Sequence, residues 1–248
     1  MSTLILALTA GAVIGLALGA LGGGGSVLAV PALIYLLGFT PVAATTASLV
    51  IVAVTSATAM SAHARDGNVR WRTGLLFAAA GIGPAMLGGA LAGRIPAVAL
   101  TAAFAVVAGA AALRMLRTRR HADTTVPVRP GRAAAAGAGL GAVTGVLGVG
   151  GGFLAVPALV SVLGMRMRNA VGTSLLVITV NSLAALAARA GTVDGLDWAV
   201  VGPFAGAAIL GAWDGKRLAT KVSGGTLQRI FALVLLAVAA FMLIDAAA

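Results

Sequence analysis

The chain has 248 residues, of which 60% are hydrophobic and only 9% are charged, and its mean hydropathy is +1.07. This composition excludes a soluble globular domain of this size and is typical of an α-helical protein that crosses a membrane several times. The net charge of +11 comes from short basic clusters between apolar segments, which is the pattern of membrane-topology signals and argues against nucleic-acid binding.

Ten apolar segments follow one another along the chain, and we expect each to be helical. The first half holds Leu4–Leu21, Val27–Leu37, Val42–Ala62, Thr73–Gly93 and Ala97–Leu116. The second half holds Ala133–Leu147, Phe153–Leu163, Ala170–Ala188, Trp198–Gly215 and Thr226–Ile244. The predicted fold is therefore an all-α polytopic membrane protein. It has a first transmembrane repeat at 1–116, a basic cytoplasmic linker at 117–132 and a second transmembrane repeat at 133–248.

A glycine-rich stretch occurs in both halves at an offset of 126 residues (147 minus 21). Residues 21–33 read LGGGGSVLAVPAL, and residues 147–159 read LGVGGGFLAVPAL. Each stretch leads into one of the two short segments, of 11 residues, which as helices reach only about half of a hydrocarbon core roughly 30 Å thick. We expect each pair to form a broken or re-entrant helix hairpin whose tip lies near the bilayer midplane, inside protein or beside a water-filled cavity. Two ordinary spans joined by a tight loop at the membrane surface are the alternative.

The charges of the loops indicate that the two halves have opposite orientations. The strongly basic linker is expected in the cytoplasm, and counting segments from it puts both chain termini outside. The loops expected inside hold Arg65, Arg70, Arg72, Arg166, Arg168, Lys216, Arg217 and Lys221. The loops expected outside hold Arg94, Arg189, Asp194 and Asp197. Equivalent loops thus swap charge, as an inverted-topology repeat requires, and secondary transporters of this construction bind substrate near the midplane. A parallel repeat or a duplicated structural protein is the alternative.

The glycine loops and the third segment of each half supply the candidate site. A helix N-terminus offers unpaired N–H groups and a positive dipole end, and glycine lets an anion approach that backbone closely. Two such ends that meet near the midplane would form an anion cradle without a charged side chain. The candidate substrate-binding residues are Gly22, Gly23, Gly24, Gly25, Ser26, Thr45, Thr46, Ser48, Gly150, Gly151, Gly152, Thr173, Ser174 and Asn181. The alternatives are that the glycines only permit close packing, as we expect of Gly11, Gly15, Gly19, Gly137, Gly141 and Gly145, and that the hydroxyls bond back to their own helices.

A longer pattern runs through both halves in the same order. The glycine run is followed by Val30–Leu33 and Ala43–Leu49 in one copy, and by Val156–Leu159 and Asn169–Leu175 in the other. This duplicated pattern resembles the sulfite exporter TauE/SafE family over nearly the whole chain. The resemblance implies a membrane transporter of small anions such as sulfite or short organosulfonates. The first copy has Ala47 where the second has Thr173, so we expect unequal half-sites.

We therefore expect a secondary transporter that moves a small inorganic or organosulfonate anion across a bacterial inner (plasma) membrane by alternating access. An anion channel with the same cradle is the alternative. Its partners would be the anion and the lipid bilayer, without nucleic acid, cofactor or metal, and a homo-oligomer is compatible with the sequence. An enzyme with Ser26 as nucleophile would need a base within reach. The one conceivable base, His63, is interpreted as a helix-end residue at the membrane interface. The chain has no Glu, and its Asp residues lie in predicted loops, at segment ends or in the tail, so a buried carboxylate relay has no carrier.

Overall fold

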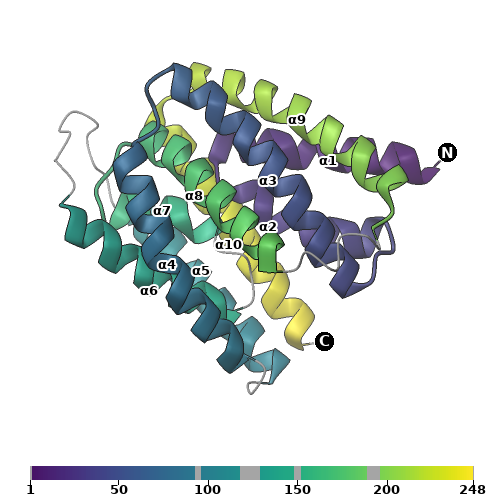
Figure 1. Ribbon diagram of the computed structural model, residues 1–248, viewed down its shortest axis with the longest axis horizontal. Helices are drawn as coiled ribbons and strands as arrows, with labels where there is room; N and C mark the ends of the chain where they lie inside the picture. Colours follow the sequence, from purple (N-terminus) through teal and green to yellow (C-terminus); the bar gives the residue numbers. More distant parts are fainter. Residues whose placement is uncertain (1, 93–95, 118–128, 148–151, 189–195, 248) are drawn as a thin grey trace.

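The computed structural model describes residues 2–92, 96–117, 129–147, 152–188 and 196–247, and these ranges contain helices and no strand (Figure 1). The first half holds α1 (Ser2–Leu21), α2 (Gly24–Pro31), the π-helical turn η1 (Ala32–Leu36), α3 (Pro41–Arg65), α4 (Trp71–Ala92) and α5 (Ala97–Arg117). The second half holds α6 (Pro130–Leu147), α7 (Gly152–Ser161), α8 (Met167–Ala188), α9 (Trp198–Lys221) and α10 (Gly224–Ala247). The all-α class and the ten predicted helical segments are confirmed.

The boundaries of the helices depart from the apolar segments where charged residues continue a helix. α9 runs on to Lys221, so Asp214 lies within the helix and not at its end. The Asp214 side chain is 64% exposed and forms an ion pair with Arg217 at 3.4 Å. A count of apolar residues stops at such charges, but a helix continues because they occupy its exposed face. Of the predicted linker, 118–128 lie outside the described residues.

Four described helices are long and apolar enough to cross a membrane. These spans are Thr3–Leu21, Val42–Arg65, Met167–Ala187 and Gly224–Phe241, within α1, α3, α8 and α10. The short α7 is apolar but has only 10 residues, so it reaches about 15 Å. The helices α2 and α7 both lie in the middle of the fold (Figure 1).

The first helix of each half packs along the fourth helix of the other half, through small residues. The backbones of Gly11, Gly15 and Gly19 lie against Phe204, Ala208 and Ala212 of α9, and those of Gly137 and Gly141 lie against Phe77 and Gly81 of α4. In both pairs a Cβ on the glycine would overlap the partner's backbone carbonyl. This spacing of four residues is the small-residue packing of membrane helices, so the packing role predicted for these glycines is confirmed. The surroundings of Gly145 lie outside the description.

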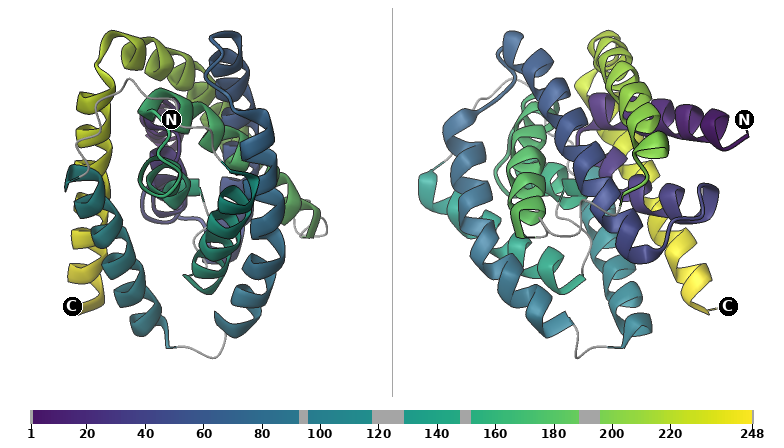
Figure 2. Two further views of the ribbon diagram at one scale, coloured as in Figure 1. Left: turned by 90° about the vertical axis from the view of Figure 1, so that its left-hand side faces the viewer. Right: turned by 45° about the vertical axis from the view of Figure 1, so that its right-hand side comes forward.

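Two pairs of equivalent helices run antiparallel. The third helices, α3 and α8, share a hydrogen bond between Ser56 and Thr179 at 2.9 Å. Beyond the end of α3, the Arg70 N–H donates to Thr173 near the start of α8 at 3.1 Å. The fifth helices, α5 and α10, lie side by side (Figure 2), and Gln228 near the start of α10 donates to the Met115 carbonyl near the end of α5 at 2.6 Å. The halves are therefore interleaved, with partners from one half packed throughout the other.

Candidate functional site

The starts of the two short helices are in contact. The backbone of Gly23, just before α2, lies against Gly152 and Phe153, the first two residues of α7. A Cβ on Gly23 would overlap the Gly152 carbonyl and would lie 2.7 Å from the Phe153 Cα. No side chain larger than hydrogen fits there without a shift of backbone. The glycine motif thus brings the two halves together at the N-termini of α2 and α7.

Gly22 directly follows the last residue of α1, and it lies against α8. Its φ is +73°, a left-handed conformation that favours glycine, and its N–H donates to the Leu18 carbonyl at 2.8 Å. This is the usual glycine termination of a helix. A Cβ at this position would overlap the Ser174 hydroxyl oxygen and would lie 3.3 Å from the Val171 Cα. Gly22 and Ser174, both predicted site residues, are therefore neighbours.

The other predicted glycines have different surroundings. Gly25 packs on α1, where a Cβ would lie 2.7 Å from the Leu18 Cβ, so close helix packing accounts for it. Gly24 and Ser26 lie in the first turn of α2, and the surroundings of their side chains are outside the description. Gly150 and Gly151 lie outside the described residues.

The predicted hydroxyls of the third helices donate to their own backbone. On α3, Thr45 and Thr46 donate to the Val42 carbonyl at 2.8 and 3.2 Å, and Ser48 donates to that of Thr45 at 2.8 Å. On α8, Ser174 donates to the Val171 carbonyl at 2.8 Å. Ser48 and Ser174 occupy equivalent positions (174 minus 48 is 126) and make the same bond. In this conformation the hydroxyls support their helices, and donation to an anion would require them to rotate.

Thr173 and Asn181 differ from these hydroxyls. Thr173 accepts the Arg70 N–H, so it holds the loop after α3 onto α8. Asn181 has a buried Oδ1 without a hydrogen-bond partner among the described residues, and so does the Oγ1 of Thr55, its equivalent on α3. A buried polar atom normally has a partner. Each of these two oxygens on the third helices could therefore accept a hydrogen bond from a water or a ligand.

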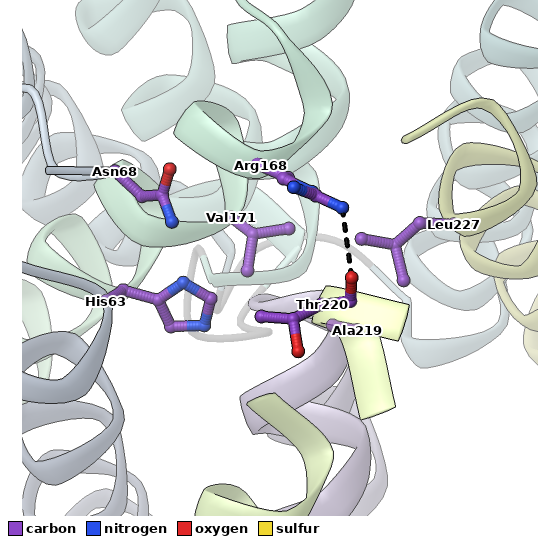
Figure 3. Close-up of a pocket in the computed structure, with 7 residues that line it drawn as sticks. All are labelled: His63, Asn68, Arg168, Val171, Ala219, Thr220 and Leu227. Atoms are coloured by element: carbon purple, nitrogen blue, oxygen red, sulfur yellow. Dashed lines mark hydrogen bonds between the residues drawn. The ribbon is translucent and has the colours of Figure 1, made fainter. Parts of the chain in front are cut away.

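A pocket that the sequence did not predict lies where α3, α8, α9 and α10 meet (Figure 3). Its lining consists of His63, Asn68, Arg168, Val171, Ala219, Thr220 and Leu227. Beside it, the Lys216 ammonium and the Asp66 carboxylate form an ion pair at 2.8 Å. Most of these residues lie at the ends of α3 and α9 and at the starts of α8 and α10, which adjoin three connections predicted to share the cytoplasmic side.

His63 is buried within the protein although it lies at a helix end. It lies in the last turn of α3, as expected, but only 4% of its surface is exposed. The end of α1 covers it, because its Nε2 lies 3.1 Å from the Gly19 carbonyl oxygen. One sequence signal pointed to this burial: His63 follows Ala59 by four residues and therefore continues a buried stripe of α3.

Comparisons of the sequence with known proteins identify a family and two relatives. A family model described as sulfite exporter TauE/SafE matches residues 7–242. The chain belongs to this family. Two Xylella fastidiosa proteins, from strains 9a5c and Temecula1, are each described as a probable membrane transporter protein. Each is 36% identical over 249 residues, which cover 97% of this chain and 95% of the relative. No solved structure matches.

Membership of the TauE/SafE family makes this chain an integral membrane transporter, as its resemblance implied. The family match spans both glycine motifs and all ten helices to within a few residues of the termini. The contact between Gly23 and Gly152 therefore lies within a transporter fold.

Proposed function

We propose that this TauE/SafE chain is a secondary transporter for a small anion of the sulfite or short organosulfonate class. The proposal rests on one observation above all, the contact of Gly23 with Gly152 and Phe153 at the starts of α2 and α7. Each start is the positive end of a helix dipole, where the N–H groups of the first turn point out of the helix and away from its own carbonyls. Two such ends side by side suit one oxyanion, whose several oxygens accept hydrogen bonds from both.

The site would consist of the candidate residues on these loops and on the third helices. Gly22, Gly23 and Gly152 would line the anion with backbone that carries no side chain, and Ser174 lies against Gly22. Ser48 is placed to do the same in the first half by its equivalence to Ser174. The Asn181 side chain would complete the polar surface, with its amide nitrogen as the donor to the anion.

Alternating access is supported by how the helices are paired. The glycine contacts of α1 with α9, and of α4 with α6, bring backbones together, so each pair should move as one body. The antiparallel third helices, α3 and α8, are what two halves of inverted topology would have, with the site between them. We place the molecule in the bacterial inner membrane with both termini outside, following the basic residues of the linker and inner loops.

Transport assays on purified protein in liposomes test this function. Radiolabelled sulfite uptake should saturate with concentration, and sulfite inside the liposomes should accelerate uptake of labelled sulfite by counterflow. Currents proportional to voltage, without counterflow, would instead indicate the anion channel. The absence of flux for sulfite, sulfoacetate and related sulfonates would contradict the proposal.

A substitution at the contact between the loops tests the site itself. Gly23→Val should reduce sulfite uptake at least tenfold while protein stays in the membrane, because its side chain would push the starts of α2 and α7 apart. Gly83→Ala on α4 is the matched control, since a Cβ there meets nothing within 4 Å. Normal uptake by folded Gly23→Val would rule out this contact as the anion site.

A further inference from the structure

The pocket at the end of α3 lies directly beside the first glycine loop. Val171 lines the pocket, and a Cβ on Gly22 would lie 3.3 Å from its Cα. The next residue, Gly172, packs on the backbone of Asn68, which also lines the pocket. Only one layer of residues thus separates the pocket from the loop where we place the anion.

His63 offers an unused nitrogen at this pocket. A carbonyl oxygen can only accept a hydrogen bond, so the contact with Gly19 requires the hydrogen of a neutral ring to be on Nε2. Nδ1 then carries a bare lone pair. It is buried and has no hydrogen-bond partner in the described part of the chain, an arrangement that is unfavourable for a polar atom. A proton on Nδ1 would convert it into a donor.

Arg168 supplies the positive charge on the other side of the pocket (Figure 3). One of its terminal nitrogens donates to the Thr220 and Val222 carbonyls at the end of α9, at 3.2 and 3.3 Å. A guanidinium has five N–H donors, and the others make no hydrogen bond to any described residue. The side chain is exposed, so these donors are accessible to an anion from solution.

The size of the cavity decides how an oxyanion would be seated. Its volume is about 10 Å³, roughly the space that one water needs. One oxygen atom of an anion fits inside, beside His63. The rest of the ion would lie at the mouth, against Arg168.

The charges around His63 link a proton to an anion. Its own helix end contributes Asp66, which is paired with Lys216 of α9, and α8 contributes Arg168. α1 has no ionisable side chain, and α10 contributes Leu227. A bound anion adds negative charge beside His63 and accepts a hydrogen bond from Nδ1–H, so each of the two ligands favours the other.

We propose that this pocket is a proton-coupled anion subsite, in which an oxyanion binds Arg168 and His63 takes up a proton on Nδ1. The proton comes from solvent, or from the O–H of a weak-acid anion such as bisulfite, and only O–H and N–H bonds change. The proposal rests on the proposed transport function and adds the coupling ion to it. His63 suits this role because it is the one buried ionisable side chain among the described residues, and imidazole exchanges protons near neutral pH.

Calorimetry of the purified full chain measures this linkage without a transport assay. Sulfite is titrated anaerobically into the protein near neutral pH, in two buffers with different enthalpies of ionisation, and the protons that bisulfite brings are counted with those taken from the buffer. The difference in heat gives the number of protons taken up per anion. We expect about one proton for the wild type.

Two variants separate the roles of the residues. In His63→Gln the amide can still donate to the Gly19 carbonyl but cannot titrate, so sulfite should bind with no proton uptake. Arg168→Gln should weaken sulfite binding about tenfold, the effect of losing a charge-assisted hydrogen bond. Arg217→Gln is the control. It removes an equal charge near the end of α9 that Arg168 contacts, but it lies outside the pocket, so sulfite binding should match that of the wild type.

Each outcome identifies which idea fails. Sulfite binding without proton uptake by the wild type, or equal proton uptake by His63→Gln, overturns the subsite and leaves the proposed transport function standing. Equal effects of Arg168→Gln and Arg217→Gln overturn the role of Arg168. Absence of binding and of flux in the folded wild type overturns the subsite together with the proposed function.

Discussion

The two short helices have nearly the same sequence, but they are buried to different extents. Both contain Leu-Ala-Val-Pro-Ala-Leu. In α7 eight of the ten residues are buried, whereas in the first half the chain becomes a π-helical turn after Pro31, and Tyr35 is 68% exposed. The second copy belongs to the larger cluster of buried apolar residues, against α5 and α8, and the first contributes Ala29 and Leu33 to a second, smaller cluster. The duplicated sequence therefore gives equivalent helices, but the packing around each copy decides how much that copy contributes to the stability of the fold.

The largest effect is expected where the first glycine loop contacts the second half. Gly22→Ala forces a side chain into the left-handed region, at about 1–2 kcal/mol, and overlaps the Ser174 hydroxyl, at roughly another 1–3 kcal/mol. Gly38 has a similar positive φ of 70° but open space around it. Gly38→Ala should therefore cost only the about 1–2 kcal/mol of the left-handed backbone. Thermal unfolding in detergent measures both. Equal losses would mean that the contact with Ser174 has no energetic weight.

A matched pair of core substitutions tests the difference between the short helices. Val156 of α7 is fully buried, and its equivalent Val30 is only partly buried. Val156→Ala should lower stability by about 1–3 kcal/mol because it leaves a cavity, and Val30→Ala should cost less than half as much. Midpoints of thermal unfolding, read by loss of the monodisperse species, give the comparison. Equal destabilisation would show that the first copy is as tightly packed as the second.

The smallest effect is expected at the ion pair between Asp66 and Lys216. Asp66→Asn should cost about 0.2–1 kcal/mol, since the side chains are 40% and 18% exposed and solvent screens them. The loss should shrink as salt rises. The equivalent position in the second half is Thr192, whose side chain carries no charge. Stability curves at low and high salt measure the difference, and an effect that grows with salt would exclude an ionic origin.

Much of the fold was predictable because the bilayer imposes a simple rule. Each apolar segment became a helix, and Gly11, Gly15 and Gly19 formed the close contacts that their spacing indicated. Helix ends were less predictable, as at Asp214, because a charge on an exposed face does not end a helix. Among the described residues of the candidate site, direct contacts between the two halves join Gly22 with Ser174 and Gly23 with Gly152.

Neighbouring residues on α8 show why the remainder of the site was not predictable. Thr173 and Ser174 are adjacent, but successive side chains on a helix point about 100° apart. One therefore binds the loop after α3, and the other lies against Gly22. Periodicity alone does not say which partner each direction meets.

By itself, the sequence determined the class of the protein, its ten helices, its duplication and its family, because hydropathy, spacing and motif are properties of local segments. Only the tertiary structure decided that Gly23 meets Gly152, that His63 is buried against Gly19, and that Arg168 lies across a pocket from it. These contacts join residues 44 to 129 positions apart (63 minus 19 and 152 minus 23). They depend on how whole helices pack, which no local pattern encodes.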